Sequence, residues 1–346
     1  MKVARNFQRC FDTVSERVFR RSVGIPLKCR WEDGDMKRMA ILLSLLLVGC
    51  SASEPSADHL VTISKAVLPV GAAISPNQMG VGRDLAGARV SQLDSTRIVA
   101  LANGAAESLV ALGFGDHLVG RDIASTFPEV AKVPVVAMGH QVSAEKVLAT
   151  SPTIVIVDAS TGPKSALEQI ASTGVSVVVI PEAWTVAAAN DRLLALGKVV
   201  GAEEAARTLL SDVPKLTISP SPRVIFLYLR GPSSIYLLGG KGSGADQVIT
   251  LAGGVDTGAS LSNKPFAPIT AETIAQANPD LILVMTKGLE SVGGVKGLIA
   301  LPGVSQTSAG KNRRVIAVDD SLLLSFGPRL PDLIKQINAA MVTVMK

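Results

Sequence analysis

VSAEKVLATSPTIVIV (142–157) and ITAETIAQANPDLILV (269–284) align without a gap and share an alanine, a glutamate, a proline and the final valine. Each stretch opens with a residue that caps helix N-termini, Ser143 in the first and Thr270 in the second. A helical stretch follows, ends before the proline, and gives way to an apolar run typical of a buried strand. The repeat predicts one helix–strand unit that is used once in each of two lobes.

Short apolar runs alternate with helical stretches around both copies of this unit. RIVAL (97–101) predicts a strand, and AAESLVALG (105–113) predicts a helix that ends at its glycine. SALEQIAST (165–173) is a helical stretch between two Val/Ile runs, and a second set of runs begins at VIFLYLR (224–230). Short Val/Ile runs separated by helices indicate an α/β fold with a buried parallel sheet.

The segment between the two sets, residues 187–213, has a strongly helical composition interrupted by two glycines. The predicted fold class is therefore α/β, with an N-terminal lobe (96–186) and a C-terminal lobe (219–346) joined by a stiff helical linker (187–218). In such sheets a ligand binds outside the carboxyl ends of the strands, so we expect a binding cleft between the lobes.

The charge of the chain is concentrated at its N-terminus. The 346 residues are 47% apolar and carry a formal net charge of +5. Residues 1–38 hold ten Lys/Arg and five Asp/Glu, which leaves 24 of each sign from the totals of 34 and 29. The body is neutral, so nucleic-acid binding is not expected.

MKRMAILLSLLLVGC (36–50) has a short basic start and an apolar run of about ten residues, half of what a membrane span needs. It ends in LVGC and resembles a bacterial lipoprotein signal, which would be cleaved after 36–49 so that Cys50 receives a lipid. An ordinary signal peptide is the alternative. Residues 1–35 would then be an over-extended reading frame or a basic extension, and 50–95 would be the lipidated cysteine, a polar tether and an extended lead-in.

Only three cysteines are present, Cys10, Cys29 and Cys50. The first two precede the predicted signal, so the mature chain offers neither a disulfide framework nor a thiolate metal site. We expect the mature protein outside the cytoplasmic membrane, anchored through Cys50.

Two positions at predicted strand ends suggest ligand chemistry. His140 follows the run VPVVAMG (133–139), where it could bind a ligand or simply be satisfied by a backbone neighbour. In VIFLYLR, strand alternation places Tyr228 and Arg230 on one face. An arginine beside a phenol stabilises the phenolate, a ligand suited to ferric iron and haem; a rim arginine beside an ordinary sheet tyrosine is the alternative.

The chain has one other tyrosine, Tyr236, in a predicted neighbouring strand, and it is the backup ligand. The following GGKGSGADQV (239–248) fits neither G-x-x-x-x-G-K-[ST] nor G-x-G-x-x-G, so no nucleotide loop is predicted. No nucleophile elbow or histidine-rich cluster is present, which argues against a hydrolase or a metal-dependent enzyme.

Over residues 96–340 the chain resembles the substrate-binding lipoproteins of bacterial haem ABC importers, a class with a rigid helical linker. The most specific parts are 119–163 and Gly327-Pro328-Arg329. Many members carry a tyrosine where this chain has His140, with an arginine two residues later. The departure matches an actinobacterial-type variant, and this resemblance implies that His140 and Tyr228 bind the haem iron from opposite faces while Arg230 supports the tyrosine.

The resemblance also implies that Glu145 and Glu272 dock into the membrane permease; a simple first-turn complement to the helix dipole is the alternative. Other possible pocket residues are Arg121 and Arg329, which could meet the haem propionates or be solvated, and Met138, which we expect to fill core space instead.

The predicted function is capture of haem (iron protoporphyrin IX) and its delivery to an ABC permease and its ATPase, by a monomer that catalyses no reaction. Haem would come free or from upstream haem-donor proteins. The alternatives are a carrier for a ferric siderophore or cobalamin, a metal-dependent enzyme on a similar scaffold, and a structural lipoprotein without a ligand.

Overall fold

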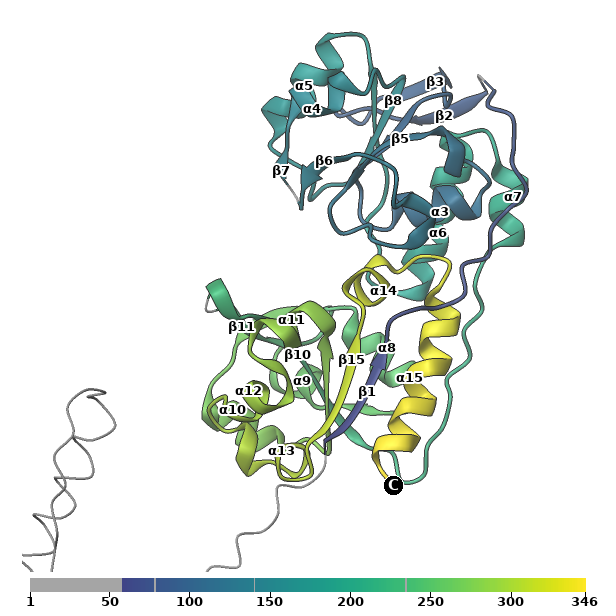
Figure 1. Cartoon of the computed structure of the whole chain (residues 1–346). Coiled ribbons are helices and arrows are strands. Elements are labelled where there is room, and N and C mark those ends of the chain that lie inside the picture. The colour runs from purple at the N-terminus through teal and green to yellow at the C-terminus, as the bar shows by residue number, and fades with distance from the viewer. Residues whose placement is uncertain (1–57, 78, 140, 234) are drawn as a thin grey trace, which may run out of the picture. The chain divides into compact units, whose positions relative to one another are not determined.

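The computed structural model describes residues 58–77, 79–139, 141–233 and 235–346, which lie in one compact unit. Two α/β lobes make up this unit, each with a sheet between layers of helices (Figure 1). Each sheet has a separate hydrophobic core on each of its faces. The predicted fold class is confirmed.

Six strands form the sheet of the N-terminal lobe in the order β7-β6-β5-β4-β8-β9. All neighbouring pairs are parallel except β6 and β7. The strands are β4 (Ile98–Ala100), β5 (Leu118–Asp122), β6 (Val135–Met138), β7 (Gln141–Val142), β8 (Ile154–Val157) and β9 (Ser176–Val179). The central strands β4 and β8 are Val/Ile-rich and are buried on both faces, as expected for parallel strands.

Helices cover both faces of this sheet. One face packs against α3 (Ala105–Ala111), α6 (Val186–Val199) and α7 (Glu203–Thr208). The other packs against α4 (Ala144–Ala149) and α5 (Lys164–Ser172). Two short 3₁₀ turns, η1 (Gly115–His117) and η2 (Pro128–Val130), complete the connections.

The sheet of the C-terminal lobe has the order β1-β15-β14-β10-β11-β13, and β12 also pairs with β10. β1, β15, β14, β10 and β12 are parallel, whereas β11 is antiparallel to β10 and β13 to β11. The strands are β1 (His59–Ile63), β10 (Arg223–Arg230), β11 (Ile235–Gly239), β12 (Val255–Asp256), β13 (Phe266–Pro268), β14 (Leu281–Met285) and β15 (Arg314–Val318).

The helices of this lobe also form two layers. On one face lie α8 (Ala245–Leu251), α14 (Asp320–Ser325) and the long α15 (Leu330–Val344), which runs beside β1 in Figure 1. The other face carries α10 (Ala271–Ala277), α11 (Thr286–Ser291), α12 (Gly294–Ile299) and α13 (Ser308–Lys311). The remaining short elements are α9 (Thr257–Leu261), η3 (Gly231–Ser233) and η4 (Val304–Gln306).

The repeated helix–strand unit is present in both lobes, as predicted. The Ser143 hydroxyl accepts the Lys146 N–H at 3.3 Å and caps α4, which leads to β8. The Thr270 hydroxyl accepts the Thr273 N–H at 3.0 Å and caps α10, which leads to β14. The two caps occupy equivalent positions because the same sequence pattern starts both helices.

The connection between the lobes is only partly helical. The connection begins with α6 and α7, and α7 ends at Thr208. No helix or strand occurs from there to the start of β10 at Arg223. The predicted helix over 187–213 is therefore too long at its C-terminal end. Residues beyond 208 instead run along the C-terminal lobe, where Leu216 and Ile218 pack on the core beside α8 and α15. Tertiary packing overrides the helical propensity of this segment.

The segment before residue 96 is more structured than a lead-in. β1 is an edge strand of the C-terminal sheet, paired in parallel with β15 from His59 to Ile63. β2 (Gly80–Arg83) and β3 (Arg89–Leu93) then form a hairpin in the N-terminal lobe, with Leu93 buried in its core. The chain therefore passes between the lobes twice, once before β2 and once after α7.

Within the residues that the structure describes, none of the helices combines the length and the apolar character needed to cross a membrane.

Candidate functional site

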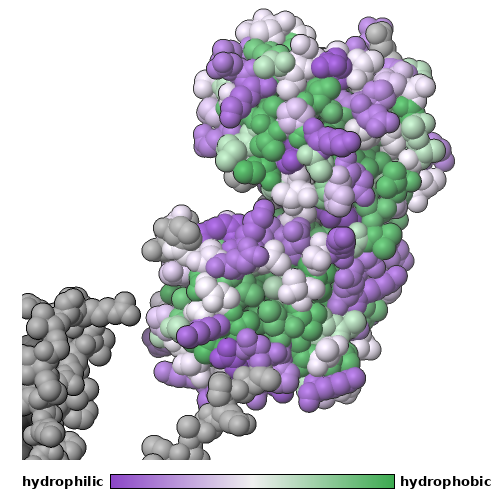
Figure 2. Space-filling model, viewed as in Figure 1, coloured by the Kyte–Doolittle hydropathy of each residue, from purple (hydrophilic) through white to green (hydrophobic). Residues whose placement is uncertain are grey.

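A cavity of about 140 Å³ lies at the carboxyl ends of strands of the N-terminal sheet, and one residue of the C-terminal lobe closes it. Leu101, Asp122 and Asp158 line it from the ends of β4, β5 and β8, and Leu324 of α14 lines it from the other lobe. Figure 2 shows the surface indented between the lobes. This is the position that the alternation of strands and helices predicts for a ligand.

The inner wall of this cavity is acidic and internally bonded. The Asp158 carboxylate accepts hydrogen bonds from the Asn103 N–H at 3.0 Å and from the Ser160 hydroxyl at 2.7 Å. Asp122 accepts a 2.5 Å bond from the Ser125 hydroxyl. Burial raises the pKa of Asp122, and its hydrogen bonds oppose that shift only in part. An anionic ligand group is disfavoured at this wall.

Apolar side chains complete the cavity. Trp184, which follows β9, lines it and packs edge-on against Phe326, with ring centroids 6.4 Å apart. Leu324 lies two residues before Phe326, so an aromatic side chain of one lobe and an aliphatic side chain of the other face the cavity. Trp184 was not among the predicted pocket residues. The signal in the sequence is that it is the sole tryptophan beyond the predicted signal peptide and follows a predicted strand.

Tyr228 and Arg230 lie together near the carboxyl end of β10, as the strand pattern predicts. The Arg230 guanidinium carbon is 4.5 Å from the Tyr228 ring centroid. Phe266 packs edge-on against the same ring at 5.7 Å. An ion pair with Asp320 at 3.3 Å and a bond to the Leu229 carbonyl at 2.8 Å hold the guanidinium in place. Tyr228 and Arg230 do not line the 140 Å³ cavity.

Tyr236, the predicted backup ligand, faces the opposite side of the sheet from Tyr228. β11 pairs with β10 so that Tyr236 lies opposite Leu229, while Tyr228 lies opposite Leu237. Residues paired across strands point to the same face, so the two tyrosines point to opposite faces. Tyr236 packs on the core beneath α10, and Tyr228 packs on the core beneath α15.

On the N-terminal side, the turn between β6 and β7 reaches the cavity through Gly139. His140 lies outside the described residues. Met138 is 58% exposed and therefore does not fill core space, contrary to expectation. It is the last residue of β6, whose two central residues are buried and whose two end residues are exposed.

Both arginines expected at a pocket rim bind groups of the protein, with Arg121 half-buried and Arg329 buried. Arg121 donates 3.0 Å hydrogen bonds to the Val130 and Val133 carbonyls and so ties down the loop before β6. Arg329 is 5% exposed and forms an ion pair with Glu107 of the other lobe at 2.7 Å. Both guanidiniums are committed to the fold, and no property of an isolated sequence position distinguishes such arginines from ligand-binding ones.

Glu145 and Glu272 are exposed in the first turns of α4 and α10, at equivalent places in the two lobes. Among the described residues, no three His, Cys, Asp or Glu side chains converge on a possible metal site.

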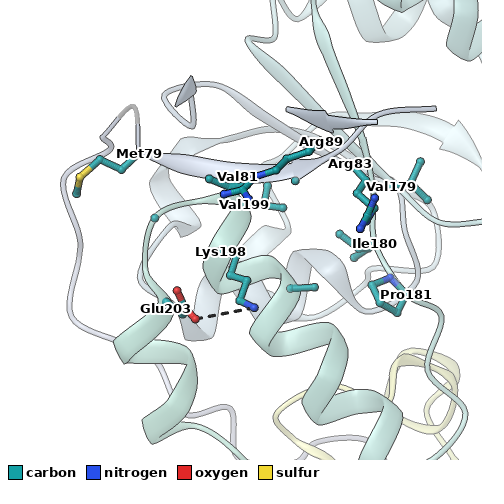
Figure 3. Close-up of a pocket in the computed structure, with 13 residues that line it drawn as sticks. Met79, Val81, Arg83, Arg89, Val179, Ile180, Pro181, Lys198, Val199 and Glu203 are labelled. Atoms are coloured by element: carbon teal, nitrogen blue, oxygen red, sulfur yellow. Dashed lines mark ion pairs between the residues drawn. The ribbon is translucent and has the colours of Figure 1, made fainter. Parts of the chain in front are cut away.

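A larger cavity, about 730 Å³, lies elsewhere in the N-terminal lobe, between the β2–β3 hairpin and α6 (Figure 3). Val81, Val179 and Val199 supply apolar walls, and Lys198 lies 4.0 Å from Glu203 at its edge. It is an open groove, and none of the residues that line it belongs to the C-terminal lobe. We therefore take the smaller cavity, which both lobes line, as the ligand site.

Two α/β lobes with a ligand site between the carboxyl ends of their sheets define a bilobal solute-binding protein. The chain belongs to the periplasmic binding protein family, whose model matches residues 98–322.

The chain is similar to two solved haem-binding proteins and to one lipoprotein. It is 31% identical to the haem-binding protein HmuT, covering 82% of this chain and 96% of HmuT with a TM-score of 0.73. It is also 34% identical to the periplasmic haem-binding protein RhuT from Roseiflexus sp. RS-1. That match covers 73% of this chain and 100% of RhuT, with a TM-score of 0.67. The ABC transporter substrate-binding lipoprotein YvrC of Bacillus subtilis (strain 168), described as uncharacterized, is 26% identical over 86% of this chain and 93% of its own.

Variants of HmuT have also been solved. Alanine replaces a histidine in one, a tyrosine in another, and in a third the arginine two residues beyond that tyrosine. The spacing of that tyrosine and arginine is the spacing of Tyr228 and Arg230 in this chain.

Proposed function

We propose that this protein captures haem outside the cytoplasmic membrane and delivers it to an ABC permease. The observation that carries the proposal is the Arg230 guanidinium lying over the Tyr228 ring near the carboxyl end of β10, in a fold whose solved relatives include haem-binding proteins. A phenolate is a hard anionic ligand for ferric haem iron, and a stacked cation stabilises it.

In this proposal Tyr228 and His140 are the two axial ligands. Gly139, which lines the cavity from the N-terminal lobe, directly precedes His140 in the sequence. Imidazole and tyrosinate are both standard haem ligands. Arg230 touches the Tyr228 ring and acts through it.

The chemistry of the cavity suits one orientation of haem. Trp184 and Leu324 supply apolar contacts for the porphyrin face. Asp122 and Asp158 line the inner wall, where like charges would repel the two propionates. The propionates would therefore point away from this wall and toward solvent.

Titration of haemin into the soluble chain beginning at Ser51 tests the proposal. We expect a saturable Soret shift in the wild type, and altered spectra for His140→Ala and Tyr228→Ala. Tyr236→Phe is the matched control, because Tyr236 points to the other face of the sheet, and it should bind as the wild type does. A saturable shift that neither alanine variant alters would contradict the ligand pair. No shift would favour a ferric siderophore or cobalamin instead.

We further propose that Glu145 and Glu272 contact the permease, one from each lobe. Both carboxylates are exposed, and equivalent helix starts present them. Reversing both charges, by Glu145→Lys and Glu272→Lys, should abolish haem uptake by cells and leave haemin binding unchanged. Reversal of two other exposed acids, Glu168 and Glu290, is the control and should leave uptake intact. Loss of haemin binding in the first pair would overturn this role.

Anchoring through a lipid on Cys50 completes the proposal. Cys50 and the predicted signal lie outside the described residues, and the first described strand begins nine residues later at His59. Mass spectrometry of the mature N-terminus should find a lipidated Cys50 and no peptide from residues 1–35. A peptide from that stretch in the precursor would show that the extension is translated.

A further inference from the structure

A buried ion pair joins the two lobes beside the ligand site. Glu107 of α3 is 1% exposed and accepts two hydrogen bonds from Arg329 at the start of α15: from its backbone N–H at 2.9 Å and from its guanidinium at 2.7 Å. The same guanidinium lies 4.9 Å from the ring centroid of Phe127, a core residue of the N-terminal lobe. A side chain of one lobe is thus inserted into the other.

A second buried arginine binds both lobes at once. Arg192 of α6 is 1% exposed. It donates to the Asn103 carbonyl of the N-terminal lobe at 2.7 Å, and to the Ser325 and Phe326 carbonyls of the C-terminal lobe at 2.6 and 2.8 Å. Burial lowers its pKa to about 10, which Glu107 and Asp158 oppose, so it stays charged at neutral pH.

Two glycines allow the lobes to approach this closely. A Cβ on Gly104, which has φ 69°, would lie 2.2 Å from the Ser325 carbonyl oxygen. A Cβ on Gly327 would lie 2.4 Å from a Glu107 carboxylate oxygen. Each glycine belongs to one lobe and faces a polar group of the other lobe. A side chain at either position would therefore push the lobes apart.

These contacts continue directly into the ligand site. Asn103, whose carbonyl binds Arg192, lines the cavity and donates its side-chain N–H to the Leu324 carbonyl at 2.6 Å. Leu324 lines the same cavity from the C-terminal lobe. A change in the angle between the lobes would therefore alter the distance between the two walls that hold the ligand.

We propose that Glu107, Arg192 and Arg329 form an interlobe lock that sets the width of the ligand cleft before ligand arrives. A buried charge that loses its hydrogen-bond partners is costly, and the partners of these side chains come from both lobes. The Nε atoms of Arg192 and Arg329 already lack a partner among the described residues, so the remaining bonds hold both charges and small rotations of the lobes would break them. The three members of the lock are positioning residues, and its effect on haem rests on the proposed function.

Spin-label distance measurements test the lock without haem. Residues 51–346 contain no cysteine, so labels can be placed at Lys164→Cys in α5 and Lys311→Cys in α13, both exposed and one in each lobe. We expect one narrow distance distribution in the ligand-free protein. Gly327→Ala should shift or broaden it. Gly115→Ala is the control, because its added Cβ would meet nothing nearer than 3.5 Å.

Two further variants separate the lock from a general loss of folding. Arg192→Lys keeps the charge but loses the planar fork that reaches carbonyls on both lobes. Glu107→Gln keeps the size of the side chain and removes its charge. Both should broaden the distance distribution while circular dichroism reports unchanged secondary structure. An unchanged distribution in folded Gly327→Ala, Arg192→Lys and Glu107→Gln would overturn the lock.

Haemin binding gives the second readout. If the lock positions the cleft, folded lock variants should lose about tenfold or more in haemin affinity, mainly through faster dissociation. The Soret maximum of the bound form should stay at the wild-type position, because the iron ligands are intact. Wild-type affinity in variants with a broadened distribution would refute the effect on the cleft. Absence of haemin binding by the wild type would reject the proposed function and leave the spin-label test of the lock valid.

Discussion

The Arg230 guanidinium lies against the ring of Tyr228 and is held there by Asp320 and by the Leu229 carbonyl. This arrangement fixes a cation beside a phenol at the end of a strand. Period-two alternation already places the two residues on one face of β10. The opposite orientation of Tyr236 depends on the register of β11, which no local pattern reveals.

Replacement of Arg230 by Gln should weaken haemin binding about tenfold, because charge-assisted stabilisation of a ligand anion contributes roughly 1–2 kcal/mol. Spectrophotometric titration measures the effect. Arg223→Gln is the matched control, since Arg223 lies at the other end of the same strand and should leave affinity unchanged. Equal losses in both variants would mean that Arg230 acts only on the stability of β10.

Asp256 should give a distinctive pH dependence of stability. It caps α9 by accepting the Gly258 N–H at 2.8 Å, and burial, with a smaller effect of Asp246, raises its pKa from 3.8 to about 6. The folded state therefore binds this proton more tightly than the unfolded state does. Its stabilising contribution is complete below pH 3.8 and is lost as the pH rises through 6.

Asp256→Asn removes this titration and keeps a capping side chain. Relative to that variant, the wild type should gain roughly 1–3 kcal/mol of unfolding free energy between pH 7 and pH 4. Urea denaturation at several pH values measures the difference. A constant difference across this range would show that Asp256 titrates normally.

At the scale of elements, the clearest local signals are the two capped helices and the buried strands that follow them. Each begins at a Ser or Thr that accepts a backbone N–H and ends before a proline, so the pattern requires no distant partner. The sequence of β1 carries no comparable local pattern that predicts a strand. Its residues His59–Ile63 become a strand because β15 offers an open edge, and β15 lies some 250 residues further along the chain.

The role of β1 in the C-terminal lobe can be tested on the strand itself. Ile63 is 4% exposed and packs into the core beneath α15, whereas Leu60 is 40% exposed. Ile63→Ala should lower the unfolding free energy by about 2–5 kcal/mol, and Leu60→Ala by less than about 1 kcal/mol. Chemical denaturation of both variants measures these losses of unfolding free energy. Equal, small effects would indicate that β1 detaches without loss of the core.

For the whole molecule, the relative placement of the lobes rests on two chain passages and on a buried polar interface. Arg192 and the Glu107–Arg329 pair occupy that interface, directly beside the ligand cavity. The extended return path after Thr208 packs along the C-terminal lobe, so helix stiffness alone does not set the interlobe geometry.

Ligand choice should be visible in the stability of the whole protein. A ligand that binds only the folded state adds about 2.7 kcal/mol to the unfolding free energy when its free concentration is 100 times Kd. We expect haemin to produce this gain in the wild type but not in the His140→Ala/Tyr228→Ala double variant. Cobalamin at the same concentration should give none, and a gain with cobalamin alone would reverse the assignment.

The sequence by itself determined the α/β class, the two lobes, most strand and helix positions, and the shared face of Tyr228 and Arg230. These features depend on local periodicity, capping and buried apolar runs, which neighbouring residues specify. Only the tertiary structure decided that β1 joins the C-terminal sheet, that the linker helix stops at Thr208, and that Arg329 pairs with Glu107. Each of these depends on partners far away in the chain, and a buried arginine has the same local sequence signature as a solvated one.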